Sequence, residues 1–153
     1  MQLKITTDYA VRAILYLAMQ DGRVVSSSEV AEVMGIPRKY LIQIGAELKK
    51  AGLIRTHTGV QGGYSLAREA GQILLFDIVE VMEGTTRINR CLEPDGYCSR
   101  SAAECPIKRC YCSMQELWDD FLKGFSVARM LEQTADEKRR VYAAPPPNLP
   151  EPD

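Results

Sequence analysis

Long apolar runs are missing from this sequence, and no stretch approaches the roughly 18 residues that a membrane-spanning helix needs. The segment Met1–Asp8 contains no apolar secretory core. Internal repeats are absent, as are the Walker, Rossmann and HExxH signatures. These absences argue against a membrane protein and against the enzyme classes that these signatures mark. We therefore expect a cytoplasmic protein that is not an enzyme.

Cysteine is absent outside residues 91–112, yet five cysteines lie within that segment. Structural disulfides are rare in the cytosol, so clustered thiols there more often bind metal or act in redox chemistry. The intervals between successive cysteines are six, six, four and one residues, at Cys91, Cys98, Cys105, Cys110 and Cys112. Zinc sites usually pair cysteines about two to four residues apart. The spacing therefore favours an iron–sulfur cluster, which would need a fourth ligand from elsewhere, with a thiol–disulfide switch as the alternative.

The sequence has little net charge, only −1, but its basic and acidic residues are unevenly divided along the chain. Residues 1–70 carry nine basic and six acidic side chains, whereas residues 71–153 carry ten and fourteen. A basic front half suits a nucleic-acid reader joined to a second element. An uneven scatter of solvated charges explains the same numbers equally well.

The first half of the chain has the periodicity of three helices. Thr6 or Thr7 is expected to cap a first helix that ends before Asp21, with its apolar residues at helical spacing. A short second helix over residues 29–34 and a longer third helix starting near Pro37 follow, separated by a turn with a glycine. A short helix, a turn and a longer helix are typical of a helix-turn-helix.

Two short segments after the third helix, residues 53–57 and 64–66, have the composition of strands. The six residues between them include three glycines. A hairpin directly after a candidate recognition helix predicts a winged helix. The fold class is therefore mainly α with a small β-hairpin wing, and residues 1–84 are expected to form a winged helix-turn-helix domain that binds DNA.

The first turns of a recognition helix reach base edges in the major groove, and a wing approaches the neighbouring minor groove or backbone. Each candidate taken singly could also be an ordinary exposed polar residue, and His57 is better explained as a wing residue than as a metal ligand. The DNA-binding candidates are Arg38, Lys39, Tyr40, Gln43, Arg55, His57, Gly59 and Gln61.

The second half is expected to contain four further parts. A helix over residues 73–83 completes the winged domain, and a cysteine-rich loop occupies residues 85–112. A long helix over residues 113–135 carries an apolar stripe too large for a small domain to cover, which predicts homodimerisation. Residues 136–153 are rich in proline and are expected to form a disordered tail.

The sequence resembles the Rrf-two family of bacterial winged-helix transcription regulators over about residues 1–135. The resemblance rests on the opening residues 1–18, on residues 36–41 and 52–54, on the wing residues 59–64, and on residues 78–84. It implies a homodimer that binds a double-stranded DNA operator and acts as a repressor. Members with three cysteines before the long helix hold an iron–sulfur cluster, either 2Fe–2S or 4Fe–4S, and sense cluster supply, nitric oxide or redox state.

The same resemblance implies the ligand set Cys91, Cys98 and Cys105, completed by Asp8 from the partner subunit. Some relatives use only two cysteines, so the alternative ligand pair is Cys98 with Cys105, and the alternative role of Asp8 is that of a carboxylate favoured at the start of a helix. Two features depart from common members: each gap between these cysteines is one residue longer, and Cys110 and Cys112 are additional. Other relatives hold no cluster and regulate through a thiol or disulfide switch, which is the alternative function.

Overall fold

The computed structural model describes residues 2–94, 96 and 105–133. Its elements in chain order are α1 (Ile5–Ala18), α2 (Ser27–Met34), α3 (Arg38–Lys50), β1 (Ile54–His57), β2 (Gly63–Leu66), the 3-10 turn η1 (Ala70–Gln72), α4 (Leu75–Glu83), the 3-10 turn η2 (Arg90–Leu92) and α5 (Pro106–Lys123). A further helical segment covers residues 127–133. The predictions for Cys98 and for the tail over residues 136–153 lie outside the described residues.

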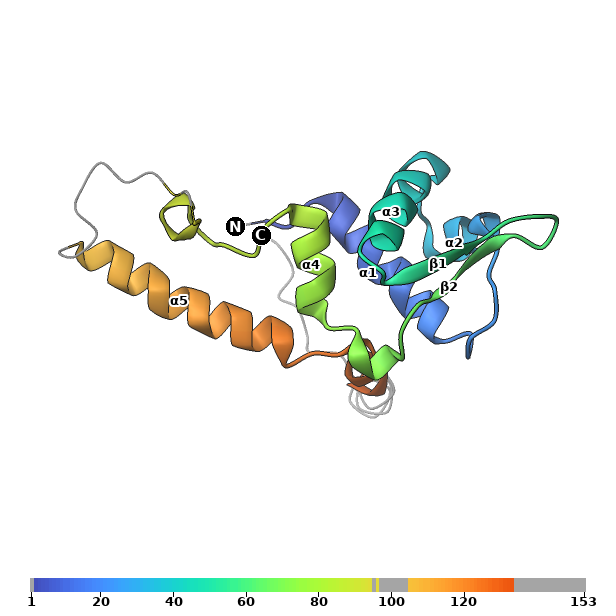
Figure 1. Cartoon of the computed structure of the whole chain (residues 1–153). Coiled ribbons are helices and arrows are strands. Elements are labelled where there is room, and N and C mark those ends of the chain that lie inside the picture. The colour runs from blue at the N-terminus through green and yellow to red at the C-terminus, as the bar shows by residue number, and fades with distance from the viewer. Residues whose placement is uncertain (1, 95, 97–104, 134–153) are drawn as a thin grey trace, which may run out of the picture.

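Helices α1–α4 and the hairpin form one body, which we call the head, and α5 extends away from it at the end opposite the hairpin (Figure 1). Helix α1 lies at the centre of the head and contacts α2, α3 and α4. Its fully buried Ile14 belongs to the same core cluster as Ile44 and Leu48 of α3 and Ile78 of α4. Each fully buried aliphatic side chain of this kind stabilises the fold by about 1.5–3 kcal/mol.

The helix-turn-helix forms as predicted. Ser26 caps α2, because its hydroxyl accepts a hydrogen bond from the Glu29 backbone N–H at 3.1 Å. Gly35 ends α2 with a φ of 63°, a left-handed conformation that favours glycine. The buried Ile36 then anchors the turn before α3 begins at Arg38.

The predicted cap of the first helix is wrong. Lys4 occupies the cap position of α1 and makes no side-chain cap hydrogen bond. Thr7 lies one turn further in and is fully buried, and its hydroxyl donates to the Glu83 carboxylate at the end of α4. The contact with Glu83 lies 76 residues away in sequence, so local capping preferences could not indicate it.

The two strands pair antiparallel, from Ile54 opposite Leu66 to His57 opposite Gly63. Val25 adds an isolated bridge to Tyr64, with N–H to oxygen distances of 2.8 and 2.7 Å. A Cβ at Gly63 would lie 2.0 Å from the Val25 carbonyl oxygen, so this crossing requires glycine. The hairpin, with its glycine-rich tip at residues 58–62, is the wing of a winged-helix fold, as the sequence predicts.

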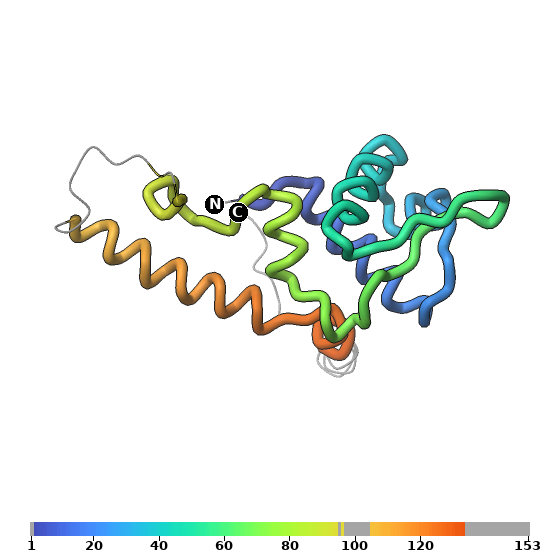
Figure 2. The backbone as a smooth tube through the Cα atoms, viewed as in Figure 1, coloured from blue at the N-terminus to red at the C-terminus, as the bar shows by residue number. Residues whose placement is uncertain are grey.

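The long helix differs in both bounds from the predicted one. Helix α5 begins at Pro106, inside the predicted cysteine loop, and ends at Lys123 rather than near residue 134. Figure 2 follows the backbone from α5 back to the head, where residues 127–133 lie. The Leu75 N–H bonds the Phe125 carbonyl at 2.8 Å, and the Val127 N–H bonds the Ile73 carbonyl at 2.9 Å. These backbone bonds and the fully buried Val127 explain why the helix stops.

Candidate functional site

Helix α3 divides into two faces. Leu41, Ile44, Gly45 and Leu48 are buried against the head. The four predicted DNA contacts of this helix, Arg38, Lys39, Tyr40 and Gln43, are exposed. The two basic residues and the amide therefore lie at the start of a helix whose apolar face is fixed, which is the arrangement that base reading in the major groove requires.

Two of these α3 residues already have partners within the head. The Arg38 guanidinium donates to the Ser28 hydroxyl at 2.8 Å, which links α3 to the start of α2. The Tyr40 ring lies 5.9 Å from the Tyr9 ring at an interplanar angle of 51°. Among the described residues, Lys39 makes no side-chain hydrogen bond or ion pair, and Gln43 makes only a 3.5 Å contact with Glu47. Lys39 and Gln43 are thus the two side chains most readily available to a DNA ligand.

The predicted wing residues are exposed, but they are not equally available. His57 Nε2 lies 2.8 Å from the Ser65 hydroxyl on the neighbouring strand, so the ring contributes to hairpin pairing. Arg55 reaches the Ala67 carbonyl at 3.4 Å. Gly59 has a φ of 103° at the wing tip, beside Gln61. Sequence reasoning missed Val60, which is fully exposed between them; an apolar residue among glycines was the available signal.

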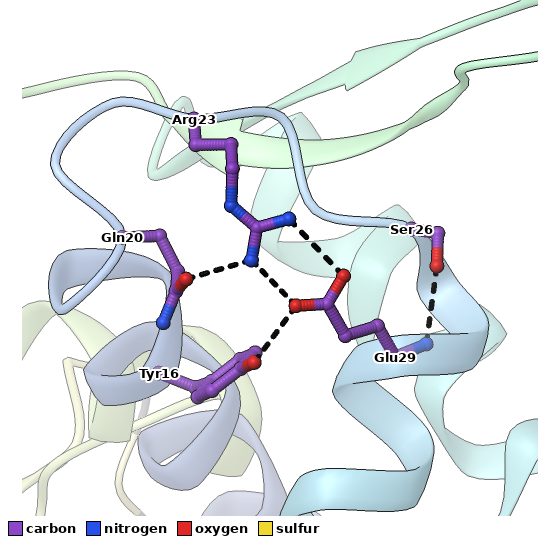
Figure 3. A network of polar contacts seen from close by, with 5 residues as sticks. All are labelled: Tyr16, Gln20, Arg23, Ser26 and Glu29. Carbon is purple, nitrogen blue, oxygen red and sulfur yellow. Dashed lines mark hydrogen bonds and ion pairs between the residues drawn. The ribbon is translucent and has the colours of Figure 1, made fainter.

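A polar network links α1 and the loop after it to the start of α2 (Figure 3). The Glu29 carboxylate accepts from Arg23 at 2.5 and 3.2 Å and from the Tyr16 hydroxyl at 2.8 Å. Arg23 also donates to Gln20 at 2.7 Å. The hydrogen bonds from Arg23 and then Tyr16 hold the pKa of Glu29 below its ordinary value. The network is structural rather than DNA-reading, because its side chains bond one another.

Four cysteines belong to the described residues, and all four are free thiols. Cys91 lies in η2, where its backbone N–H donates to the Asn89 side chain at 3.2 Å, and Cys105 directly precedes α5. Both are half-buried, and η2 contacts α5, so the fold brings the Cys91 segment against the helix that Cys105 begins. Soft thiolates suit an iron–sulfur cluster. Within the described ranges, no three metal-ligating side chains are gathered into one group.

Cys110 and Cys112 are exposed on α5 rather than in a loop. Residues two apart on an α-helix point about 200° apart around its axis. These two thiols therefore cannot pair with each other while the helix is intact, and they cannot both face the Cys91 segment. Only Cys110 lies among the exposed apolar residues of the helix, three residues after Ile107 and four before Met114.

Asp8 lies in the first turn of α1, as predicted. Its carboxylate forms an ion pair with Arg12 at 2.6 Å, and its side chain is 46% exposed. It borders a shallow groove of about 240 Å³ together with the exposed Leu3 and Ile5. The carboxylate is therefore accessible from outside the chain, and none of its described contacts is to a cysteine of the same chain.

Glu83 ties the start of α1 to the end of α4. Its carboxylate accepts from the Lys4 backbone N–H at 2.9 Å and from the Thr7 hydroxyl, and the Lys4 ammonium lies 3.5 Å away. Burial alone would raise the pKa of Glu83, but the hydrogen bonds from Thr7 and Lys4 outweigh it and hold the pKa below its ordinary value. Sequence reasoning missed this residue, because its partners lie more than 70 positions away.

The Glu83→Gln variant is expected to lose stability at neutral pH and to match the wild type in acid. A carboxyl with a lowered pKa in the folded state stabilises that state above its ordinary pKa, and the contribution vanishes as the pH falls through the lowered pKa. The expected loss at pH 7 is about 1 kcal/mol, because a partly exposed ionic hydrogen bond is weakened by solvent. Thermal unfolding between pH 3 and 7 measures it, with the exposed Glu80→Gln variant as control. A constant difference across that range would contradict the assignment.

Helix α5 carries large apolar side chains on one exposed face. Ile107, Met114, Leu117 and Phe121 are each at least half exposed. Next to this face lies a groove of about 550 Å³, lined by Ile88, Asn89, Tyr111, Met114, Leu117 and Trp118. We call the four exposed residues and this groove the α5 face. An exposed apolar surface of this extent is typical of an interface.

Comparisons with known proteins agree with this architecture. The model of the Rrf2 family, described as iron-dependent transcriptional regulators, matches residues 3–133. A relative in Aquifex aeolicus (strain VF5) that carries the name of an HTH-type transcriptional regulator is 32% identical over 127 residues, which cover 82% of this chain and 88% of the relative.

Several solved structures share the fold of this chain. The structure of T. potens IscR superposes with a TM-score of 0.66 at 30% identity and covers 88% of each chain. The structure of CymR, the global cysteine regulator of B. subtilis, has a TM-score of 0.71 at 22% identity and covers 87% of this chain and 98% of its own. The oxidized form of Staphylococcus aureus CymR has a TM-score of 0.66 at 26% identity, with coverages of 85% and 95%.

No helix among the described residues is both long and apolar enough to span a membrane. The head has the winged-helix architecture of DNA-binding regulators, and basic and amide side chains are exposed at the start of α3. The match to the family model extends through the head, the cysteine segment and α5. This chain belongs to the Rrf2 family of winged-helix transcription regulators, which are DNA-binding proteins and not enzymes.

Proposed function

We propose that this protein is a homodimeric, iron–sulfur-sensing transcription regulator of the cytoplasm that represses genes by binding a double-stranded DNA operator. The observation that carries the proposal is that two free thiols lie on two segments that contact each other outside the head. Cys91 lies on the segment that leaves the head, and Cys105 begins the helix that this segment contacts. A group bound between these segments would connect the chain that leaves the head to the proposed dimerisation helix.

The ligand set in this proposal is Cys91, Cys98 and Cys105, with Asp8 supplied by the second copy. Asp8 supports this role because its carboxylate is nearly half exposed and its ion pair with Arg12 is a surface pair, which is weak and exchangeable. A bound iron–sulfur cluster, 2Fe–2S or 4Fe–4S, would supply sensitivity to nitric oxide, oxygen or cluster shortage. A carboxylate binds iron less tightly than a fourth thiolate, so such a site is expected to be labile.

The proposed DNA interface consists of the start of α3 and the wing. Lys39 and Gln43 are expected to reach base edges in the major groove, and Arg38 and Tyr40 to hold the phosphate backbone. The wing residues Arg55, His57, Gly59 and Gln61 are expected to approach the neighbouring backbone or minor groove. A homodimer places two such heads on two half-sites, which suits an operator with two-fold symmetry.

The α5 face is the proposed dimer interface, and Leu117→Glu is expected to give a monomer. A two-fold interface buries each Leu117 once per chain, and each fully buried leucine contributes about 1.5–3 kcal/mol. Losing both weakens dimerisation at least about a hundredfold, because 1.4 kcal/mol is a factor of ten in affinity. Light scattering after size exclusion measures the mass, which is 17.1 kDa for one chain.

The control for this variant is Glu116→Ala, which changes the adjacent, exposed residue on the polar side of α5. It should remain a dimer. A Leu117→Glu protein with the wild-type mass at micromolar concentration would exclude the α5 face as the interface.

The direct test of the proposed function is anaerobic purification followed by iron and sulfide supply. The wild-type protein should become brown, with about one cluster per subunit, and its affinity for the operator should change when the cluster is removed. A colourless, iron-free product with unchanged DNA affinity would count decisively against a cluster sensor.

The second candidate is a cluster-free regulator that switches through its thiols. It is favoured by the four free cysteines of the described residues and by the similarity to proteins named CymR, one of them solved in an oxidized form. Mild oxidation should then produce one defined disulfide by mass spectrometry, together with altered DNA affinity. The Cys110–Cys112 pair is not the expected product, because these residues lie on different faces of α5.

A further inference from the structure

Buried polar side chains collect at one place in this protein. Among the described residues, four polar residues are buried: Thr7, Ser65, Thr86 and Gln115. Three of them, Thr7, Thr86 and Gln115, belong to the elements that meet around residues 84–88, the strap between the head and the cysteine segment. Buried polar groups are the informative exception in a protein interior, because each must be hydrogen-bonded.

Gln115 is the centre of this group and is only 4% exposed. Its Oε1 accepts from the Ile88 backbone N–H at 2.8 Å, and its Nε2 donates to the Thr86 carbonyl at 3.1 Å. One amide on α5 thus bonds the main chain at both ends of a three-residue segment, as a neighbouring strand would. The second Nε2 proton goes to Asp119 Oδ1 at 2.6 Å, which fixes the orientation of the amide.

The strap is held from its two ends. Asp119 Oδ2 also pairs with Arg87 at 3.6 Å, so the residue between the two Gln115 contacts is attached to α5 as well. At the other end, Glu83 fixes the strap to Lys4 and Thr7 of α1. The strap therefore cannot shift along α5 without breaking the bonds of Gln115, and these bonds are shielded from water.

This clamp lies close to the thiols in sequence. Ile88 precedes Cys91 by three residues, so the two Cα atoms are at most about 11 Å apart. Asn89 continues the restraint through its bond to the Cys91 N–H at 3.2 Å. Cys105 begins the same rigid helix on which Gln115 lies. The Gln115 clamp therefore restrains the position of Cys91 relative to the helix that Cys105 begins.

We propose that Gln115 is a positioning residue for the thiol site: its clamp on Thr86 and Ile88 sets the separation of Cys91 from Cys105 and thereby the retention of a bound iron–sulfur group. This inference rests on the proposed function for the identity of the bound group. The spacing of the two thiols can be measured without it.

The test compares the full-length wild type with Gln115→Ala. In the first arm, Cys98, Cys110 and Cys112 are replaced with serine in both proteins, and a short bis-maleimide links the two remaining thiols within one iron-free chain. We expect Gln115→Ala to change the linking rate at least threefold. In the second arm, both proteins keep all their cysteines, are reconstituted with iron and sulfide, and are then mixed with an iron chelator. We expect iron release to be about tenfold faster in Gln115→Ala, as is typical when a residue that orients a metal ligand is lost.

Glu116→Ala is the matched control, since it removes the exposed neighbour of Gln115 on the same helix. If Gln115→Ala does not fold, as judged by its thermal transition, Asp119→Ala keeps both main-chain bonds and removes the side support of the amide. It should shift both readouts in the same direction by a smaller factor.

The outcomes separate the two proposals. Linking and release rates within twofold of the wild type, for Gln115→Ala or for its substitute Asp119→Ala, would overturn the positioning role. If the wild-type protein takes up no iron, the proposed iron–sulfur function is contradicted. The cross-linking rates alone then test whether Gln115 positions the two thiols.

Discussion

Replacing Cys105 with serine is expected to abolish iron–sulfur binding, whereas replacing Cys112 with serine should leave it intact. A serine hydroxyl is a hard and weakly acidic ligand, so it cannot substitute for a soft thiolate. Cys105 begins α5, the helix that the Cys91 segment contacts, whereas Cys112 lies two helical turns further on the exposed surface. The expected cluster content falls from about one per subunit to a few per cent in Cys105→Ser. Visible absorbance and iron analysis after identical anaerobic reconstitution measure it.

The pair of variants is matched, because each removes one sulfur from the same chain without changing its charge or length. Equal iron contents in the two variants would show that the ligand set is misassigned. Loss of the cluster in Cys112→Ser but not in Cys105→Ser would show that the third ligand is Cys112 and not Cys105. The same preparations can be examined by DNA binding, which would show whether the operator needs the loaded or the empty form.

The second large effect is expected at the start of α3. Replacing both Lys39 and Gln43 with alanine should lower operator affinity about a hundredfold or more, because each good contact to a base edge is worth about 1–3 kcal/mol. Both side chains are exposed, and neither has a strong partner within the head. Stability should change little, since exposed positions away from caps and cores tolerate substitution. Fluorescence anisotropy with a labelled operator at several salt concentrations measures the affinity.

The matched control is Lys49→Ala with Lys50→Ala, which removes two exposed basic residues from the last turn of the same helix. That variant should retain sequence-specific binding. If both double variants lose affinity equally, general electrostatic attraction rather than base reading explains the binding. The salt dependence separates these cases, because phosphate contacts steepen it and base contacts do not.

The helix-turn-helix could be predicted from sequence because its signals are local. Ser26, Gly35 and Pro37 mark helix ends through the conformations of single residues, and the buried face of α3 follows a 3.6-residue period. The exposed positions of Lys39 and Gln43 follow from the same period. Gly63 also lies in the glycine-rich wing pattern, but the requirement for glycine at this position comes from a distant part of the chain. Any side chain there would clash with the Val25 carbonyl.

The start of α1 and the end of α5 could not be predicted in this way. The predicted apolar stripe continues from Met114 past Leu122 to Leu131, and periodicity alone does not reveal that the chain stops being helical within it. The interruption comes from the backbone of Ile73 and Leu75, which bonds residues 125–127. Glu83 likewise displaces the expected cap by bonding Lys4 and Thr7.

The amino-acid sequence alone determined the winged helix-turn-helix, the exposed face of α3 and the presence of a thiol-rich segment, because helix caps, periodicity and cysteine spacing are properties of neighbouring residues. Tertiary structure decided that the Cys91 segment contacts the helix that Cys105 begins, that two thiols lie exposed on that helix, and how the strap is held. Gln115 shows why: its amide contacts residues 27 and 29 positions away. Hydrogen bonds over such separations depend on packing, which no local pattern encodes.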